Sequence, residues 1–191
     1  MNGFKKPEKN ILFGFTFILI WFLSIVIVTA APQRCFAVEP WGIYVERIED
    51  TEGLERCKIC GKILGIGSIH MDAEAIVVNH LKNTLKEMEI DFIDNKGTDR
   101  YIHVLIYRFM ERRGGNLAVE RPASVGFHIH LIEKNNNLKK VYVFDETQQA
   151  LSQNVFKLRS FLKRRARWLT ASELAEEGIY EALQTLKEDL R

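Results

Sequence analysis

Residues 101–145 read YIHVLIYRFMERRGGNLAVERPASVGFHIHLIEKNNNLKKVYVFD and carry the strongest strand signals of the chain. Side chains that favour β-structure fill 101–109, and apolar residues alternate with small or polar ones along 124–133. The three asparagines at 135–137 favour a hairpin turn into a third strand over 140–145. Three consecutive strands joined by polar loops predict an antiparallel meander.

The residues before this stretch predict one further strand and one helix. A first strand is expected over 43–48, and the glycine-punctuated stretch 57–68 indicates a turn or loop. Apolar side chains then recur at helical spacing over 73–88, with Asp72 placed to cap the amino end of that helix.

The C-terminal third is predicted to be helical. One helix is expected from about residue 152, and a second follows a break at 168–170. Thr170 and Glu173 have the spacing of a capping box, and the apolar stripe of the last helix must be buried against the sheet. The predicted fold class is α+β, a two-layer sandwich with a mostly antiparallel sheet and helices packed on one face.

The amino-terminal residues predict a membrane-targeting segment. Lys5, Lys6 and Lys9 precede an uncharged run at 11–31, in which 17 of 21 residues are apolar. At about 1.5 Å per residue, a helix of this run reaches roughly 30 Å and spans bilayer hydrocarbon. The basic end should stay in the cytoplasm. We therefore expect a single-pass inner-membrane protein whose C-terminal domain lies in the periplasm, preceded by one transmembrane or signal helix.

Cleavage of this segment is the alternative. Ala30 and Ala37 each end an acceptable signal-peptidase site, which would release a secreted periplasmic protein. Cys35 invites lipidation, but Pro32 and Arg34 do not match a lipobox. We accordingly divide the chain into residues 1–37, the basic end plus the anchor or signal peptide, and residues 38–191, one periplasmic α+β domain.

The charge balance excludes a nucleic-acid binder, because the net charge is only +2. Basic residues are nevertheless concentrated locally, and a charge run is either a solvated face or a contact surface. A contact surface would suit an envelope protein, a cell-wall polymer or anionic lipid. The candidate contact residues are Arg112, Arg113, Arg121, Lys163, Arg164 and Arg165.

Cys57 and Cys60 form a C-x-x-C-G element that can close a disulfide, bind a soft metal or exchange electrons. The glycine after the second cysteine suits a zinc knuckle, but no second C-x-x-C exists and neither His70 nor His80 has the usual ligand spacing. The glycines do not start the helix that a thioredoxin-like site requires. In an oxidising periplasm we expect a local disulfide and no cofactor, with zinc as the alternative.

A second candidate metal group contains only histidines. His128 and His130 share one face of the strand expected over 124–133, and His103 could lie on the same face of the neighbouring strand. Three histidines are the ligands of some catalytic zinc sites. Alternation makes any H-x-H in a strand co-facial, however, so half-exposed histidines without a ligand role are the preferred interpretation.

Signatures of catalysis are missing from the sequence. It contains no nucleophile elbow, no phosphate-binding glycine loop and no H-E-x-x-H motif. Adjacent carboxylates such as Asp145 and Glu146 point in different directions in a regular element and do not converge. We therefore expect no enzymatic activity.

The stretches ERPASVGFHIHL (120–131), FDETQQALSQNVFKL (144–158) and WLTASELAEEG (168–178) resemble those of an uncharacterised family of exported bacterial proteins, often described as lipoproteins. The order of elements is more loosely similar to small α/β domains of envelope-assembly proteins, such as the amino-terminal domain of TolB, the curli-secretion lipoprotein and the penicillin-binding-protein activator lipoproteins. The resemblance implies a membrane-tethered periplasmic interaction module in envelope assembly or maintenance. The alternative is a metal-binding or thiol-redox protein that uses Cys57 and Cys60.

Overall fold

The computed structural model describes residues 39–49, 53–95, 98–114, 119–148, 162, 164 and 167–191. The predicted membrane segment at 11–31, Cys35 and most of the helix expected from residue 152 lie outside these residues. Among the helices that are described, none is both long enough and apolar enough to cross a membrane.

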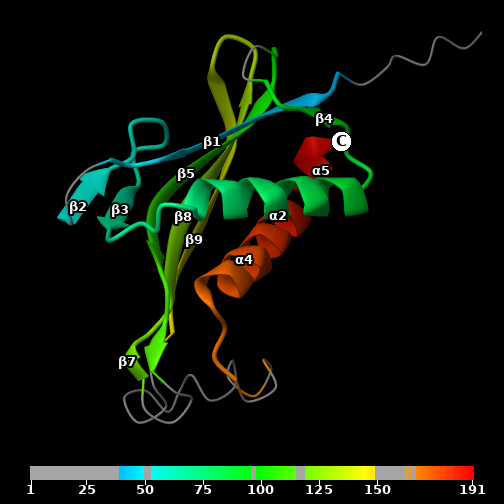
Figure 1. The fold of residues 1–191 in the computed structure, drawn as a ribbon. Helices are drawn as coiled ribbons and strands as arrows, with labels where there is room; N and C mark the ends of the chain where they lie inside the picture. Colours follow the sequence, from blue (N-terminus) through cyan, green and yellow to red (C-terminus); the bar gives the residue numbers. More distant parts are fainter. Residues whose placement is uncertain are drawn as a thin grey trace, which may run out of the picture. The chain divides into compact units, whose positions relative to one another are not determined.

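The elements follow one another along the chain in a mixed order of strands and helices (Figure 1). They are β1 (Trp41–Arg47), β2 (Gly53–Arg56), β3 (Ile63–Ile66), α2 (Ala73–Glu87), β4 (Phe92–Ile93), β5 (Tyr101–Met110), β6 (Arg113–Gly114), β7 (Val119–Arg121), β8 (Ser124–Glu133), β9 (Asn137–Thr147), α4 (Ala171–Thr185) and α5 (Lys187–Leu190).

A five-stranded sheet in the order β4-β1-β5-β8-β9 forms the centre of the fold. The predicted meander is confirmed, because β5 pairs with β8 and β8 with β9 in antiparallel orientation. Asn135 and Asn136 adopt positive φ angles of 62° and 59° at the turn into β9, as a tight hairpin requires.

The expectation of a mostly antiparallel sheet is wrong for the other half of the sheet. β1 pairs in parallel with both β4 and β5. Parallel neighbours need a long crossover, and α2 lies within the segment that connects β1 to β5. The sheet is therefore mixed, with two parallel and two antiparallel junctions.

Both long helices lie on one side of the sheet, as predicted. α2 contacts β1 and β5, whereas α4 contacts β8 and β9 and also α2 (Figure 1). The layer between helices and sheet is the main apolar core. Its fully buried members include Trp41, Val77, Leu81, Ile102, Val104, Phe127, Ile129, Leu174 and Ile179.

The two predicted helix starts differ in outcome. Thr170 and Glu173 form the expected capping box at the start of α4. Asp72 occupies the cap position of α2, but its side chain makes no capping hydrogen bond. The Asp72 carboxylate instead lies 3.7 Å from Nδ1 of His70.

The stretch 57–68, predicted to be a turn or loop, contains part of a small second sheet. β2 and β3 pair in antiparallel orientation, with Glu55 opposite Leu64 and Arg56 opposite Ile63. We call residues 53–66 the β2–β3 hairpin. It lies against β5, where Leu64 and Ile66 are buried with Leu105 and Tyr107 in a small cluster apart from the main core.

Candidate metal centre

A tight turn in the β2–β3 hairpin brings two thiols together. The backbone N–H of Gly61 donates to the carbonyl oxygen of Cys57, and the backbone N–H of Cys57 donates to the carbonyl oxygen of Lys62. Both N···O distances are 2.8 Å. Gly61 adopts a φ of 71°, which side chains with a Cβ rarely tolerate. The C-x-x-C-G element therefore folds as the knuckle that its glycine allows.

Strand β8 supplies two imidazoles on the sheet face opposite the main core. Val125, Phe127 and Ile129 point into the core, so His128 and His130 project from the other face. The prediction that these two histidines share a face is confirmed. The expected half-exposure is wrong, because each histidine has 0% exposed surface.

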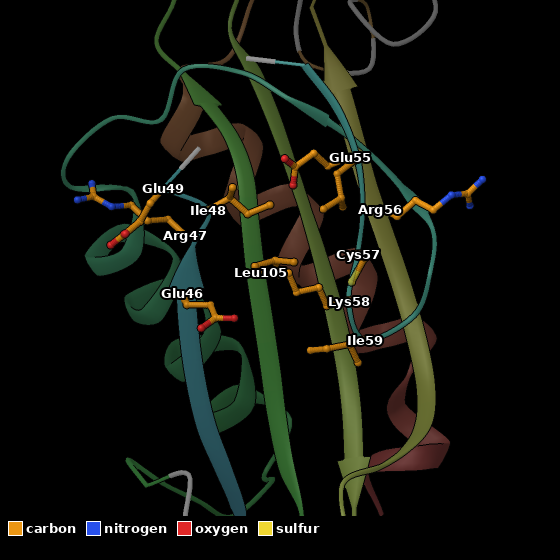
Figure 2. A pocket seen from close by; sticks show the side chains of 11 residues that line it. Glu46, Arg47, Ile48, Glu49, Glu55, Arg56, Cys57, Lys58, Ile59 and Leu105 are labelled. Atoms are coloured by element: carbon orange, nitrogen blue, oxygen red, sulfur yellow. The ribbon is translucent and has the colours of Figure 1, made fainter. Parts of the chain in front are cut away.

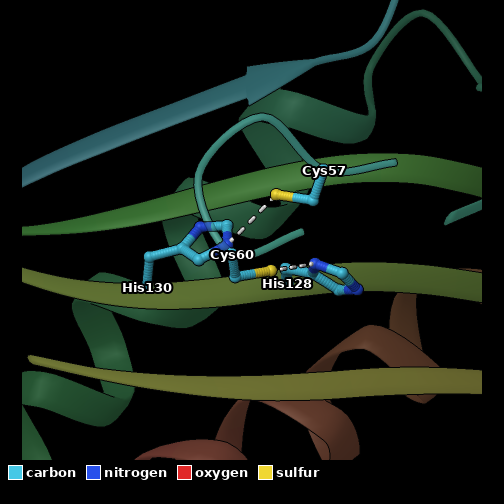
Figure 3. A group of neighbouring side chains, drawn as sticks. All are labelled: Cys57, Cys60, His128 and His130. Atoms are coloured by element: carbon cyan, nitrogen blue, oxygen red, sulfur yellow. Dashed lines mark hydrogen bonds between the residues drawn. The ribbon is translucent and has the colours of Figure 1, made fainter. Parts of the chain in front are cut away.

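The hairpin places its cysteines directly over these histidines (Figure 3). Sγ of Cys57 lies 3.4 Å from Nε2 of His130. Sγ of Cys60 lies 3.5 Å from Nδ1 of His128. The four ligand atoms all lie within 4.8 Å of one another.

These distances fit a tetrahedral ion. With Zn–S of about 2.3 Å and Zn–N of about 2.0–2.1 Å, a regular tetrahedron has S···N edges of about 3.6 Å. Two thiolates and two imidazoles are a usual donor set of tetrahedral zinc sites. The group Cys57, Cys60, His128 and His130 can thus hold Zn²⁺ after small shifts of the side chains.

Burial sets the protonation of the group in the metal-free state. Desolvation lowers the pKa of His128 to about 4, assisted by nearby Lys62. It lowers the pKa of His130 to about 3, assisted by His103 and His128. Both rings are therefore neutral at neutral pH, and each has a lone pair to offer a metal. Burial also raises the pKa of the Cys60 thiol, so metal binding must displace a proton there.

One atom of the group lacks a partner. Within the described part of the chain, Nε2 of His128 is buried and makes no hydrogen bond. A buried polar atom without a partner costs about 1–3 kcal/mol. The nitrogen of His128 that faces Cys60 is Nδ1, so an ion bound there would leave Nε2 as it is, and this orphaned atom does not itself argue for a metal.

A further layer of polar groups continues behind His130. Nδ1 of His103 lies 3.1 Å from Nδ1 of His130, and Nε2 of His103 lies 3.0 Å from Oε1 of Glu46. The hydroxyl of Tyr44 donates to Oε2 of Glu46, with an O···O distance of 2.6 Å. His103, predicted as a possible third histidine ligand, lies beside the four-residue group and not within it.

A cavity of about 230 Å³ adjoins the centre on the Cys57 side. Figure 2 shows charged side chains of both signs around it, from β1, from the residues just after it and from the hairpin, including Glu46, Glu49, Glu55, Arg47, Arg56 and Lys58. Cys57, Leu64 and Leu105 supply part of its apolar lining. Cys57 lines this cavity, although the residue itself is only 2% exposed.

The disulfide expected from the sequence is not present, because Cys57 and Cys60 are free thiols. Each half of the centre was recognisable as a motif, C-x-x-C-G on a turn and H-x-H on a strand. What the sequence interpretation missed is that each motif supplies the other's missing ligands. Sixty-eight residues separate Cys60 from His128, so no local spacing rule connects them.

Four of the basic residues predicted to contact a partner are described by the structure: Arg112, Arg113, Arg121 and Arg164. Arg113 and Arg121 lie opposite each other in the β6–β7 pair. Nη1 of Arg112 donates to the backbone carbonyl oxygen of Trp168, with an N···O distance of 3.4 Å. Lys163 and Arg165 lie outside the described residues.

Arg164 is engaged inside the domain. Its side chain is 8% exposed, and its guanidinium binds two carboxylates, Glu146 of β9 and Glu177 of α4. Four hydrogen bonds of 2.9–3.1 Å make these contacts. The geometry assigns Arg164 a role in holding the chain before α4 against β9 and α4.

No protein-family model matches the chain, and the search of curated proteins gives no match. Solved structures with a similar arrangement include PelC of Paraburkholderia phytofirmans, solved as a dodecamer. PelC is 14% identical over 76% of this chain and 86% of its own, with a TM-score of 0.47. Protein XCC0632 of Xanthomonas campestris, assigned to DUF330, is 10% identical over 79% of this chain and 88% of its own, with a TM-score of 0.43.

Lipoprotein GNA1162 of Neisseria meningitidis is a further neighbour. It is 9% identical over 66% of this chain and 99% of its own, with a TM-score of 0.37. The neighbours thus include bacterial lipoproteins. Identities and TM-scores this low do not establish a common family.

Proposed function

We propose that this chain is an exported zinc protein of the bacterial envelope, in which one Zn²⁺ fastens the β2–β3 hairpin to the central sheet. The observation that carries the proposal is the convergence of Cys57, Cys60, His128 and His130, whose ligand atoms lie within 4.8 Å of one another. The four ligands come from two segments that are far apart in sequence, so the ion would cross-link the fold.

The ligand set supports a structural role for the ion. Catalytic zinc sites keep three protein ligands and one open position, whereas structural sites use four protein ligands. A site with four protein ligands leaves no position for a substrate or an activated water. The proposal therefore retains the expectation that the chain has no enzymatic activity.

The position of the thiols supports metal binding over thiol–disulfide exchange. Reactive cysteines of the thioredoxin type sit at a helix amino terminus, which lowers their pKa. Here Cys57 directly follows strand β2 and precedes a turn. Burial raises the pKa of Cys60, which disfavours the thiolate in the absence of a metal.

The hairpin needs such a fastening. An isolated two-stranded hairpin is at best marginally stable in water. Among the described residues, the apolar cluster that holds the β2–β3 hairpin has five buried members: Cys57, Leu64, Ile66, Leu105 and Tyr107. Structural zinc supplies folding free energy to small elements of this kind.

The envelope location is part of the proposal and rests on the sequence. The basic end and the apolar run at 11–31 support export and inner-membrane tethering. A tethered, non-catalytic domain suits an interaction module in envelope assembly or maintenance. Arg112, Arg113 and Arg121 remain the candidate contact residues for an envelope protein, cell-wall polymer or anionic lipid.

Metal analysis of the full chain, purified in detergent from cells grown with zinc, tests the proposal. We expect about one zinc per chain for the wild type and less than about one tenth for His128→Ala and Cys60→Ser. His80→Ala is the matched control, because His80 lies on α2, bonded to Ser172, and should leave the zinc content unchanged. A wild-type protein that is folded by circular dichroism but binds no zinc contradicts the proposal.

A further inference from the structure

Three adjacent strands place a row of side chains at one level of the sheet. Tyr44 of β1 is the register partner of His103 of β5, which in turn pairs with His130 of β8. The rings stack, with centroids 5.2 Å apart for Tyr44 and His103 and 5.3 Å apart for His103 and His130. Interplanar angles of 18° and 16° keep the three planes nearly parallel.

Hydrogen bonds run along this row from solvent to the metal ligands. Glu46, whose side chain is 40% exposed, contacts Nε2 of His103, which is 2% exposed. The other ring nitrogen of His103 contacts Nδ1 of fully buried His130. The remaining nitrogen of His130, Nε2, faces the Cys57 sulfur.

Metal binding by His130 would fix the direction of these hydrogen bonds. An ion on Nε2 leaves the proton of that ring on Nδ1, which then donates to Nδ1 of His103. His103 accepts there, carries its own proton on Nε2 and donates it to Glu46, whose ionised carboxylate only accepts.

We propose that Glu46 and His103 are positioning residues of the metal centre, which hold His130 in the tautomer that offers Nε2 to the ion. The inference rests on the proposed zinc site and adds to it the residues that prepare one ligand. Hydrogen-bond partners behind a ligating histidine orient its ring and raise its basicity. Tyr44 supports the row by donating to Oε2, the other carboxylate oxygen of Glu46.

His128 provides an internal contrast. Its Nδ1 faces Cys60, and its Nε2 makes no hydrogen bond within the described residues. The two histidine ligands therefore differ: a hydrogen bond to His103 orients the ring of His130, whereas Nε2 of His128 has no such partner among the described residues. A change at His103 should act on His130 and leave the His128 ring where it is.

The test compares full-length variants in detergent, using Zn²⁺ itself and a chromophoric chelator as competitor. His103→Phe keeps an aromatic ring in the stack but removes the acceptor for His130, and should weaken zinc binding about 10–100-fold. Glu46→Gln keeps an acceptor oxygen without the charge and should have a smaller effect. Glu49→Gln, which also lines the cavity, is the control and should bind zinc as the wild type does.

Nitrogen-15 NMR of the histidine side chains supplies a readout that a general loss of packing would not reproduce. In the zinc-bound wild type, His130 should carry its proton on Nδ1 and bind the metal through Nε2. In His103→Phe, the slowly exchanging Nδ1–H signal of His130 should disappear, while the His128 signals stay in place.

The inference is overturned if His130 binds zinc through Nδ1, or if folded Glu46→Gln and His103→Phe both bind zinc within twofold of the wild type. Those results would leave the zinc site itself intact. A wild-type protein that binds no zinc overturns the proposed function as well, so the two failures are distinguishable. Should His103→Phe not fold, NMR of the zinc-bound wild type still decides, because it shows through which nitrogen His130 binds the metal.

Discussion

The sulfur of Cys57 lies 3.4 Å from Nε2 of His130, although 73 residues separate them in sequence. One residue belongs to a small hairpin and the other to the centre of the main sheet. Apart from this centre, the described residues join the two through a small apolar cluster and a hydrogen bond from Nη1 of Arg108 to the carbonyl of Gly65. The state of the centre should therefore decide whether the hairpin stays in place.

Chelating the metal should release the β2–β3 hairpin and spare the sheet. We expect faster hydrogen exchange at residues 53–66, because the hairpin lies outside the main core, and unchanged protection in β5 and β8. Mass-spectrometric exchange on the full chain measures both. Cys60→Ser should match the chelated wild type, and equal protection of the hairpin with and without metal would refute the prediction.

Replacing Gly178 by alanine should destabilise the fold. Alanine normally stabilises a helix relative to glycine, but a Cβ at Gly178 of α4 would lie 2.7–2.8 Å from ring atoms of Phe144. Overpacking of this kind costs about 1–3 kcal/mol. Chemical denaturation should show the loss for Gly178→Ala.

Asn83→Ala is the control for that substitution, because Asn83 is exposed on α2 and alanine has the higher helix propensity. It should leave the free energy of unfolding unchanged or slightly higher. A stabilised Gly178→Ala variant would show that α4 does not pack on β9 as closely as described.

Arg164 should matter for stability far more than its neighbour Arg167. Arg164→Ala leaves Glu146 and Glu177 without their partner, and breaking a largely buried ion pair costs about 3–5 kcal/mol. Arg167 is 54% exposed and pairs with Glu173, a contact worth about 1 kcal/mol or less. Denaturant midpoints for the two alanine variants test this difference, and similar losses would argue against an internal role for Arg164.

The capping box of α4 should make a pH-dependent contribution to the free energy of unfolding. The backbone N–H of Thr170 donates to Glu173 and, with Arg167, holds the pKa of that carboxyl below its ordinary value. A lowered folded-state pKa stabilises the fold above the unfolded value of about 4.3, and the contribution is lost as pH falls through the folded value. Glu173→Gln should therefore destabilise by about 1 kcal/mol or less at pH 7.

The gap between Glu173→Gln and the wild type, meaning the difference in their free energies of unfolding, should close as the pH falls below about 4. Glu176→Gln serves as the comparison, since Glu176 is exposed on the same helix. Urea unfolding at several pH values measures both gaps. A gap for Glu173→Gln that does not change with pH would mean that the carboxylate charge has no part in capping.

The elements with strong local periodicity were predictable. Strand 124–133 was expected with the bounds that β8 has, and the apolar spacing over 73–88 matches α2. Local patterns do not reveal which strands become neighbours after a crossover, so the parallel pairing of β1 with β5 was missed. Strand β3 was not predicted because it contains Gly65 and is followed by Gly67, and glycine ordinarily weakens a strand.

Each half of the metal centre was recognisable in the sequence as a separate local motif. The knuckle of Cys57 and Cys60 and the shared face of His128 and His130 both follow from local rules. Their meeting depends on the docking of a hairpin across β5, which no spacing in the sequence encodes. Isolated C-x-x-C and H-x-H motifs in one small domain are therefore worth testing as two halves of one site.

X-ray absorption spectroscopy of the zinc-loaded full chain tests the central claim most directly. The account predicts one zinc per chain bound by two sulfurs at about 2.3 Å and two nitrogens at about 2.0–2.1 Å. A zinc shell without sulfur, or a folded wild-type protein with Cys57 and Cys60 joined in a disulfide and no bound metal, would contradict it.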